Sequence, residues 1–277
     1  YHTHAADMRA EGSYGVIVVA PKRPLPEEDY DGVLTMILGD WYHKSVNDIN
    51  AGLLQNGAFS WAFNGNSVLV NGKGACAECP SVTTQSVTTT TYPNGATSSS
   101  SCTAQQEVLS VMPNKKYIIH IVSAASLAYY NLAIAGHQLT VIGADNSTLQ
   151  HFTTSSVDIN SGSRLRVILK TSAVPMAYKI RVQTDWRGTD NSNAGVGYAL
   201  LAYNGDTTSV SSAVPQNEVR VFDEWLKLLR ASSTSVLQDP CPQSASKQVL
   251  LVPIQQWVNM TTGLGLDPPL KSAGTPG

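Results

Sequence analysis

The chain has 277 residues, of which 14% are charged, and its formal net charge is −2 at pH 7. This length suffices for one large domain or two modest domains with a substantial buried core. Without excess positive charge there is no basic face to neutralise phosphates, which excludes a nucleic acid as partner. No run of about 18 apolar residues occurs, so no segment is expected to span a membrane. The low charge content and the abundant Ser, Thr, Gly and Val favour a β-rich extracellular protein over a helical cytosolic one.

The first segment carries two histidines one residue apart, His2 and His4. Residues two apart on a strand point to the same face, so the two imidazoles can serve one copper or zinc site. A His-x-His pair on its own leaves two interpretations open, a metal site and two ordinary surface histidines. Beyond the pair, a turn at Gly12–Gly15 leads into Val16–Val19, a β-branched run that predicts a strand.

Strand signals separated by turn signals continue through the middle of the chain. Val68–Val70, for example, ends at Asn71-Gly72, a dipeptide typical of tight turns. The expected strands cover residues 33–38, 68–70, 105–112, 117–122, 132–134, 139–142, 165–169, 178–182 and 198–201. Such a series is typical of a β-sandwich, and we assign residues 27–205 to one sandwich.

Three stretches interrupt this pattern. Thr83–Ser101 is rich in Ser and Thr, buries too little apolar area to offset its ordering entropy, and is expected to be a long mobile loop. Residues 206–246 read as a linker with one amphipathic helix that packs onto a neighbouring sheet. The apolar side chains at helical spacing in this linker are Phe222, Trp225, Leu226 and Leu229. Residues 247–277 open with a new strand and are expected to start a further sandwich.

The chain contains four cysteines, Cys76, Cys79, Cys102 and Cys241. They are compatible with disulfides in a secreted protein. A zinc site on Cys76 and Cys79 is the alternative, although zinc ribbons use two close pairs and the other two cysteines are scattered. Acceptor sequons at Asn146 and Asn259 predict glycosylation sites if the source is a eukaryote.

Several longer segments resemble those of one enzyme family. Asp40–Ser45 is similar to the Asp-Trp-Trp-His-x-Ser segment that opens the second domain of ascorbate-oxidase-like multicopper oxidases. Further matches in the same order are residues 67–74, 111–117, 126–128, 131–134 and 136–145. The His-x-His pair with its Gly-Ser-Tyr-Gly turn is similar to the second histidine motif of the family, where the first cupredoxin domain ends. The chain therefore resembles an ascorbate-oxidase-like or laccase-like multicopper oxidase, as a partial chain that begins within that motif.

The resemblance implies an all-β fold, a cupredoxin-like Greek-key β-sandwich with flanking partial cupredoxin domains. Residues 1–26 would end domain 1, residues 27–205 would form domain 2, and residues 247–277 would start domain 3. It also implies a secreted enzyme that couples one-electron oxidation of small reducing substrates, ascorbate- or phenol-like, to reduction of dioxygen to water. The alternative is a non-catalytic, cupredoxin-like extracellular structural or cell-surface protein that has lost its copper.

For the site, the resemblance implies that His2 and His4 each bind one copper of the paired, type 3 site. The other cluster ligands and the whole type 1, blue-copper set are expected in the remainder of the oxidase, so this chain alone is expected to be inactive. Trp61 stands where ascorbate oxidases carry a tryptophan beside the substrate pocket, and an ordinary half-buried tryptophan is the alternative. Cys102 stands where the family bridges domain 2 to domain 1, which implies that it has no disulfide partner within this chain.

The remaining histidines have no neighbour at ligand spacing and are expected to be structural or surface residues: His43, His120, His137 and His151. The sequence shows neither a nucleophile elbow nor a pair of carboxylates at a defined spacing. We therefore predict no catalytic acid, base or nucleophile within this chain.

Overall fold

The computed structural model describes residues 1–5, 7–19, 29–54, 60, 62, 64–74, 83–91, 97–172, 174–185, 195–218 and 222–231. The chain divides into two compact units, residues 1–236 and 237–277, and every described residue belongs to the first. The strands are β1 (Gly32–Trp41), β2 (Ser67–Val70), β3 (Thr83–Thr91), β4 (Thr97–Gln105), β5 (Glu107–Val111), β6 (Lys116–Ser123), β7 (Tyr129–Ile134), β8 (Leu139–Ala144), β9 (Ser147–Thr154), β10 (Ser156–Ile159), β11 (Arg164–Lys170), β12 (Ala177–Asp185) and β13 (Val196–Tyr203). The helices are α1 (Val46–Leu54) and α2 (Phe222–Ala231).

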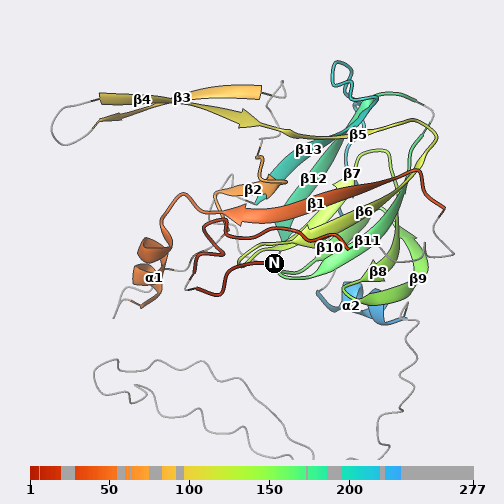
Figure 1. The fold of residues 1–277 in the computed structure, drawn as a ribbon, viewed down its shortest axis with the longest axis horizontal. Helices are drawn as coiled ribbons and strands as arrows, with labels where there is room; N and C mark the ends of the chain where they lie inside the picture. Colours follow the sequence, from red (N-terminus) through yellow and green to blue (C-terminus); the bar gives the residue numbers. More distant parts are fainter. Residues whose placement is uncertain are drawn as a thin grey trace, which may run out of the picture. The chain divides into compact units, whose positions relative to one another are not determined.

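Two mixed sheets form the sandwich (Figure 1). One has the order β2-β1-β6-β11-β8-β9 and the other β10-β7-β12-β13-β5. In each sheet one pair of neighbours is parallel, β1 with β6 and β13 with β5, and the other pairs are antiparallel. The predicted all-β, cupredoxin-like sandwich is confirmed, and every strand predicted between residues 33 and 201 is present.

The core lies between the two sheets because alternate residues of their strands point inward. Ile119 and Ile121 of β6 and Leu132 of β7 are completely shielded from solvent. On β12, Ile180 is likewise buried whereas Lys179 is exposed, as the alternation predicted. Two strands of the sandwich itself escaped prediction: β9 carries mostly polar, exposed residues, and β10 has only four residues.

The turn after β2 shows how one residue fixes strand placement. Asn71 (φ 51°) and Gly72 (φ 77°) both adopt the left-handed conformation expected of an Asn-Gly turn. The Asn71 amide oxygen accepts the Ile37 N–H at 2.8 Å, and its amide nitrogen donates to the Thr35 carbonyl at 3.1 Å. The Asn71 side chain thereby binds the turn to β1.

The Ser/Thr-rich stretch corrects one prediction. Instead of a long loop, it contains β3 and β4, which pair antiparallel from Thr83 opposite Gln105 to Thr91 opposite Thr97 (Figure 1). The loop prediction weighed only buried apolar area. It neglected that β-branched threonines favour extended backbone and that a hairpin satisfies its own backbone hydrogen bonds.

The β-branched run Val16–Val19 corrects a second prediction. These residues are not part of a strand, and Ile17 and Val19 are 71% and 82% exposed. In the described part of this segment, the only strand-type pairing is the isolated bridge between His2 and Tyr14. Strand propensity needs a neighbouring strand to pair with, and Val16–Val19 has none among the described residues.

The helix predicted after the sandwich is present as α2. Trp225 is buried and packs edge-on against Phe152 of β9, with ring centroids 5.9 Å apart. Leu226, predicted on the same apolar face, is instead 39% exposed. Helix α1 was not predicted; it begins after Ser45, whose hydroxyl accepts the Asp48 N–H at 3.2 Å as an N-cap.

Several predictions lie outside the described residues. They concern Trp61, Asn259, the cysteines Cys76, Cys79 and Cys241, and residues 247–277. Cys102 lies on β4, but its side chain is outside the described part. No helix within the described ranges is both long and apolar enough to cross a membrane.

Candidate metal centre

A short backbone ribbon positions the two histidines. Residues 1–3 pair with residues 13–15 through hydrogen bonds of 2.9, 3.0 and 3.1 Å, and His2 lies opposite Tyr14. The ring of Tyr1 lies against Gly15, where a Cβ atom would displace it. The ribbon ends where His4 leaves the pairing.

The two imidazoles lie together. The ring centroids of His2 and His4 are 4.6 Å apart and the ring planes differ by 24°, so the rings are stacked. Both residues are exposed. The predicted convergence of the two side chains is therefore present, and neither ring is buried in the sandwich.

A hydrogen bond fixes the tautomer of His2. Its Nδ1 lies 2.9 Å from the Thr3 carbonyl oxygen. A carbonyl can only accept, so Nδ1 carries the hydrogen and Nε2 of the neutral ring keeps its lone pair. Imidazole nitrogen suits copper, and a carbonyl that binds the other ring nitrogen is the usual way to orient such a ligand. The donor set of the pair thus fits copper.

Arg9 fastens this segment to the sandwich. It lies in a tight turn over residues 7–12, within which Ala10 N donates to Asp7 O at 2.9 Å. The Arg9 Nη2 atom lies within hydrogen-bond distance of the carbonyls of Ala125 (3.1 Å) and Ser126 (2.9 Å). The Ser161 hydroxyl oxygen is a third acceptor at 3.2 Å.

The loop that receives Arg9 is held from its other side by a buried carboxylate. Asp40 of β1 is 3% exposed. Its two oxygens accept the backbone N–H groups of Ser126, Leu127 and Ala128 at 2.7, 2.9 and 3.1 Å. These three bonds provide the partners that a buried carboxylate needs.

Two tyrosines lie in the field of this carboxylate. Burial and the negative charge of Asp40 raise the pKa of Tyr14. The same two causes raise the pKa of Tyr130 well above its usual value, with smaller contributions from Tyr14 and Tyr42. Both phenols therefore stay protonated at neutral pH.

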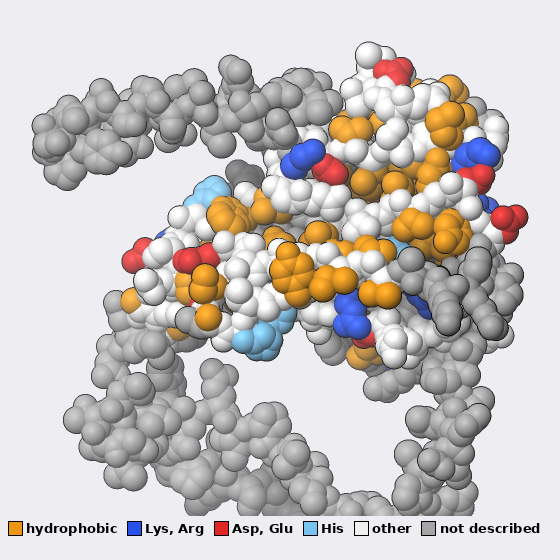
Figure 2. Space-filling model, viewed as in Figure 1, with side chains coloured by type: hydrophobic (Ala, Val, Ile, Leu, Met, Phe, Trp, Pro, Cys, Tyr) orange, Lys and Arg blue, Asp and Glu red, His pale blue; other side chains and the backbone are white. Residues whose placement is uncertain are grey.

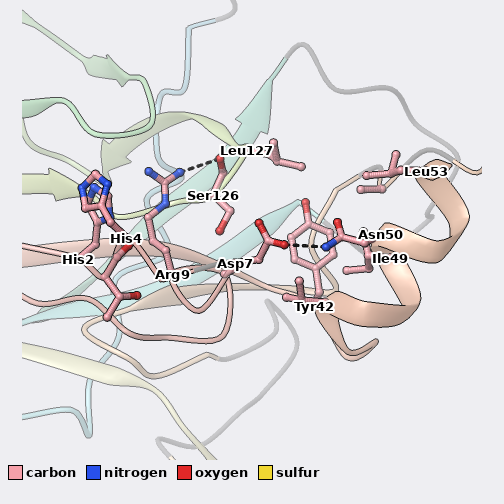
Figure 3. A pocket seen from close by; sticks show the side chains of 14 residues that line it. His2, His4, Asp7, Arg9, Tyr42, Ile49, Asn50, Leu53, Ser126 and Leu127 are labelled. Atoms are coloured by element: carbon pink, nitrogen blue, oxygen red, sulfur yellow. Dashed lines mark hydrogen bonds between the residues drawn. The ribbon is translucent and has the colours of Figure 1, made fainter. Parts of the chain in front are cut away.

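A cavity of about 450 Å³ opens beside the histidine pair. Figure 3 shows His2 and His4 at one end, Arg9 and Ser126 next to them, and Ile49 and Leu53 of α1 at the other end. Asp7 and Asn50 join the two ends, since the Asn50 amide donates to the Asp7 carboxylate at 2.6 Å. The cavity therefore has a polar end at the imidazoles and an apolar end at α1.

The other histidines do not join the pair. His137 is buried: its Nδ1 donates to the Ala135 carbonyl at 2.8 Å, and its Nε2 accepts from the Tyr203 hydroxyl at 2.8 Å. Burial lowers its pKa, although the bond to Ala135 acts in the opposite direction. His43 and His151 are exposed and His120 is half-buried. Across the described ranges, no three or more His, Cys, Asp or Glu side chains are grouped so that they could hold a metal ion.

The sequence did not reveal Arg9 or its loop. Arg9 contacts residues more than 100 positions away, and no local spacing predicts such a contact. Asp40 was singled out only as part of a motif, not as a buried acceptor. A lone acidic residue in an otherwise apolar strand was the available signal, because such a residue must find partners when buried.

These features define an all-β, cupredoxin-like sandwich that carries a pair of exposed imidazoles on an adjoining ribbon. Residues 32–206 match the family model described as multicopper oxidase, which is more than half of the chain. The chain belongs to the multicopper oxidase family.

Similar proteins include plant and fungal oxidases. The chain is 34% identical to an L-ascorbate oxidase of Brassica rapa subsp. pekinensis, over 85% of this chain and 40% of that protein. It is 30% identical to an L-ascorbate oxidase of Cucurbita maxima, over 94% of this chain and 44% of that protein. It is 27% identical to Laccase-1 of Trametes villosa, over 80% of this chain and 38% of that protein. The chain thus spans less than half the length of these curated relatives.

Proposed function

We propose that this chain is part of a copper-dependent oxidase. It would couple one-electron oxidation of a small reducing substrate, ascorbate- or phenol-like, to reduction of dioxygen to water. Family membership supports this proposal, and the observation that carries it is the stacked pair of His2 and His4 with a free Nε2 on His2. In this proposal residues 1–26 end domain 1, residues 27–205 form domain 2, residues 206–246 link it onward, and residues 247–277 start domain 3.

The proposed cofactor is copper, held by His2 and His4 as part of a type 3 pair. Copper would supply the one-electron chemistry and the binding of dioxygen. The contribution of the chain itself is orientation: the Thr3 carbonyl holds the His2 ring, and the ribbon holds His4 beside it. The remaining ligands would come from the rest of the oxidase, since two imidazoles leave most of the coordination shell open.

The test is copper content and oxygen uptake of the native protein, with ascorbate and a phenol as donors. We expect bound copper and donor-dependent oxygen uptake. His2→Ala and His4→Ala should lower the copper content and abolish oxygen uptake, whereas His43→Ala, which changes an exposed histidine outside the lining of the cavity beside the pair, should retain both. For this chain alone we expect only weak, chelator-labile copper binding. A copper-free native protein without oxygen uptake would instead support the non-catalytic extracellular alternative.

We further propose Trp61 as a wall of the substrate site. Ala62, the next residue along the chain, lines the cavity that contains His2 and His4, which supports this placement. An aromatic wall can stack on an enediol or phenol, a contact of about 0.5–1.5 kcal/mol. In the native oxidase, Trp61→Ala is therefore expected to raise KM for the donor by roughly two- to twelve-fold. A loss of stability with an unchanged KM would instead indicate a core residue.

Secretion and glycosylation are part of the same proposal. Asn146 is exposed in the turn between β8 and β9, where the side chain is accessible to solvent. Asn259 is the second proposed acceptor. On the face drawn in Figure 2, basic side chains lie apart from one another and among acidic ones. Glycosidase treatment of the native protein should lower its mass, and Asn146→Gln should remove one glycan.

A further inference from the structure

Arg9 connects the segment that carries the histidine pair to the sandwich through hydrogen bonds. One guanidinium nitrogen, Nη2, reaches three acceptors on the sandwich, two carbonyls and a hydroxyl, at 2.9 to 3.2 Å. These contacts are partly buried, whereas the two hydrogen bonds between this turn and α1 are exposed. Among those exposed bonds, Glu11 accepts the Val46 N–H at only 3.4 Å. Among the hydrogen bonds that this turn makes to other described residues, those of Arg9 are therefore the best shielded from solvent.

The loop to which Arg9 binds, residues 125–128, is itself held in place by hydrogen bonds. The loop 125–128 offers its carbonyls to Arg9 and its N–H groups to the buried Asp40. Because the two charges bind opposite ends of the peptide dipoles in one loop, each orients that loop for the other. A guanidinium suits this role since it presents several donors in a fixed plane, which an ammonium does not.

The path from Arg9 to the imidazoles is short and made of backbone bonds. Gly12 N donates to Arg9 O at 3.2 Å, and the neighbouring Ser13 carbonyl accepts the N–H of Thr3 at 3.1 Å. Thr3 lies between the two histidines. Because the rings of His2 and His4 are exposed, the sandwich does not position them by packing; the turn and ribbon set their placement.

We infer that Arg9 is a positioning residue for the histidine pair. By binding loop 125–128, Arg9 holds the two imidazoles at a fixed place over the edge of the sandwich. The inference rests on the proposed role of His2 and His4 as copper ligands. Residues that orient metal ligands typically contribute about 10- to 100-fold to metal affinity or activity. Arg9 itself touches neither ring.

The test adds Cu²⁺ to the full 277-residue chain and records two-dimensional NMR spectra of the backbone amides. Paramagnetic Cu²⁺ broadens, or bleaches, the amide signals of residues that lie close to it. In the wild type, copper on the pair should bleach the signals of residues 2–4 and also those of Ser126 and Leu127, which line the same cavity. In Arg9→Ala, the signals of residues 2–4 should still be bleached while Ser126 and Leu127 recover. Arg164→Ala, which removes an exposed arginine paired with Asp145, is the matched control and should behave as wild type.

If Arg9→Ala does not fold, Arg9→Lys keeps the charge with a single nitrogen and should show weaker bleaching at Ser126 and Leu127 than the wild type. Unchanged bleaching in a folded Arg9 variant overturns the inference. Absence of bleaching at residues 2–4 in the wild type overturns the copper role instead. In that case, amide exchange at Thr3 without metal decides the positioning role: faster exchange in Arg9→Ala supports it, and an equal rate overturns it.

Discussion

The Nε2 atom of His137 lies 2.8 Å from the hydroxyl oxygen of Tyr203. His137 belongs to the connection between β7 and β8, which passes from one sheet to the other, and Tyr203 ends β13. The same hydroxyl accepts the N–H of Ser172, which follows β11, at 2.6 Å. One buried phenol thus joins three chain segments at one end of the sandwich.

Removal of this hydroxyl should destabilise the fold. Tyr203→Phe leaves the buried His137 Nε2 and Ser172 N–H without their partner, and an unsatisfied buried polar group costs about 1–3 kcal/mol. We expect a loss of that size in the free energy of unfolding, measured by denaturant titration. Tyr198→Phe on the same strand is the control: Tyr198 is only half-buried, so we expect a change within about 0.5 kcal/mol. Equal losses in the two variants would contradict the role of the Tyr203 hydroxyl.

The buried His137 should make stability depend on pH in the acid range. Burial lowers its pKa in the folded state below the unfolded value of about 6.5. Above about pH 6.5 the histidine is neutral in both states and contributes no pH dependence. As the pH falls below that value, the unfolded state takes up a proton before the folded state does. Stability then falls by up to about 1.4 kcal/mol per pH unit until the folded pKa is reached.

The measurement is the free energy of unfolding between pH 7.5 and 4.5 for the wild type and His137→Gln. The glutamine cannot titrate, so its curve should be flatter than that of the wild type below about pH 6.5. Parallel curves would show that His137 titrates alike in both states.

The buried carboxylate of Asp40 should be far more sensitive to neutralisation than an exposed one. Asp40→Asn replaces one acceptor oxygen by a donor that faces backbone N–H groups. Hydrogen bonds to a charged group contribute about 1.5–3 kcal/mol each, so we expect at least that loss in unfolding free energy. Asp145→Asn is the control, because its ion pair with Arg164 is half-exposed and surface pairs contribute only about 0–1 kcal/mol. A loss of unfolding free energy for Asp40→Asn no larger than that for Asp145→Asn would contradict the role of Asp40 in holding loop 125–128.

Substitutions at Gly39 and Tyr14 should have coupled effects on the free energy of unfolding. A Cβ atom at position 39 would collide with the hydroxyl oxygen of Tyr14. We expect Gly39→Ala to cost about 1–3 kcal/mol as an overpacked site. Tyr14→Phe removes the colliding oxygen, so the double variant should be less destabilised than the sum of the singles, by about 0.5–3 kcal/mol. Additive losses in this double-mutant cycle would show that Tyr14 does not pack on β1 as described.

The sequence by itself determined the parts of the molecule that depend on local pattern. Alternation of polar and apolar residues, such as Lys179 and Ile180, identified the sandwich strands, because every second residue of a strand points toward the core. The Asn71-Gly72 turn followed from the left-handed conformation that those residues tolerate. The spacing of His2 and His4 predicted that the two imidazoles lie together, as the structure shows.

Only the tertiary structure decided the features that depend on a distant partner. Val16–Val19 has the residues of a strand but no neighbour among the described residues, whereas the polar threonines of β3 form a strand because β4 lies beside them. Arg9 and Asp40 meet at loop 125–128, about 120 and 90 residues further along the chain, where no local spacing relates them. Propensity and periodicity act over a few residues. Strand backbones and buried charges need hydrogen-bonding partners, and the tertiary fold supplies these from distant parts of the chain.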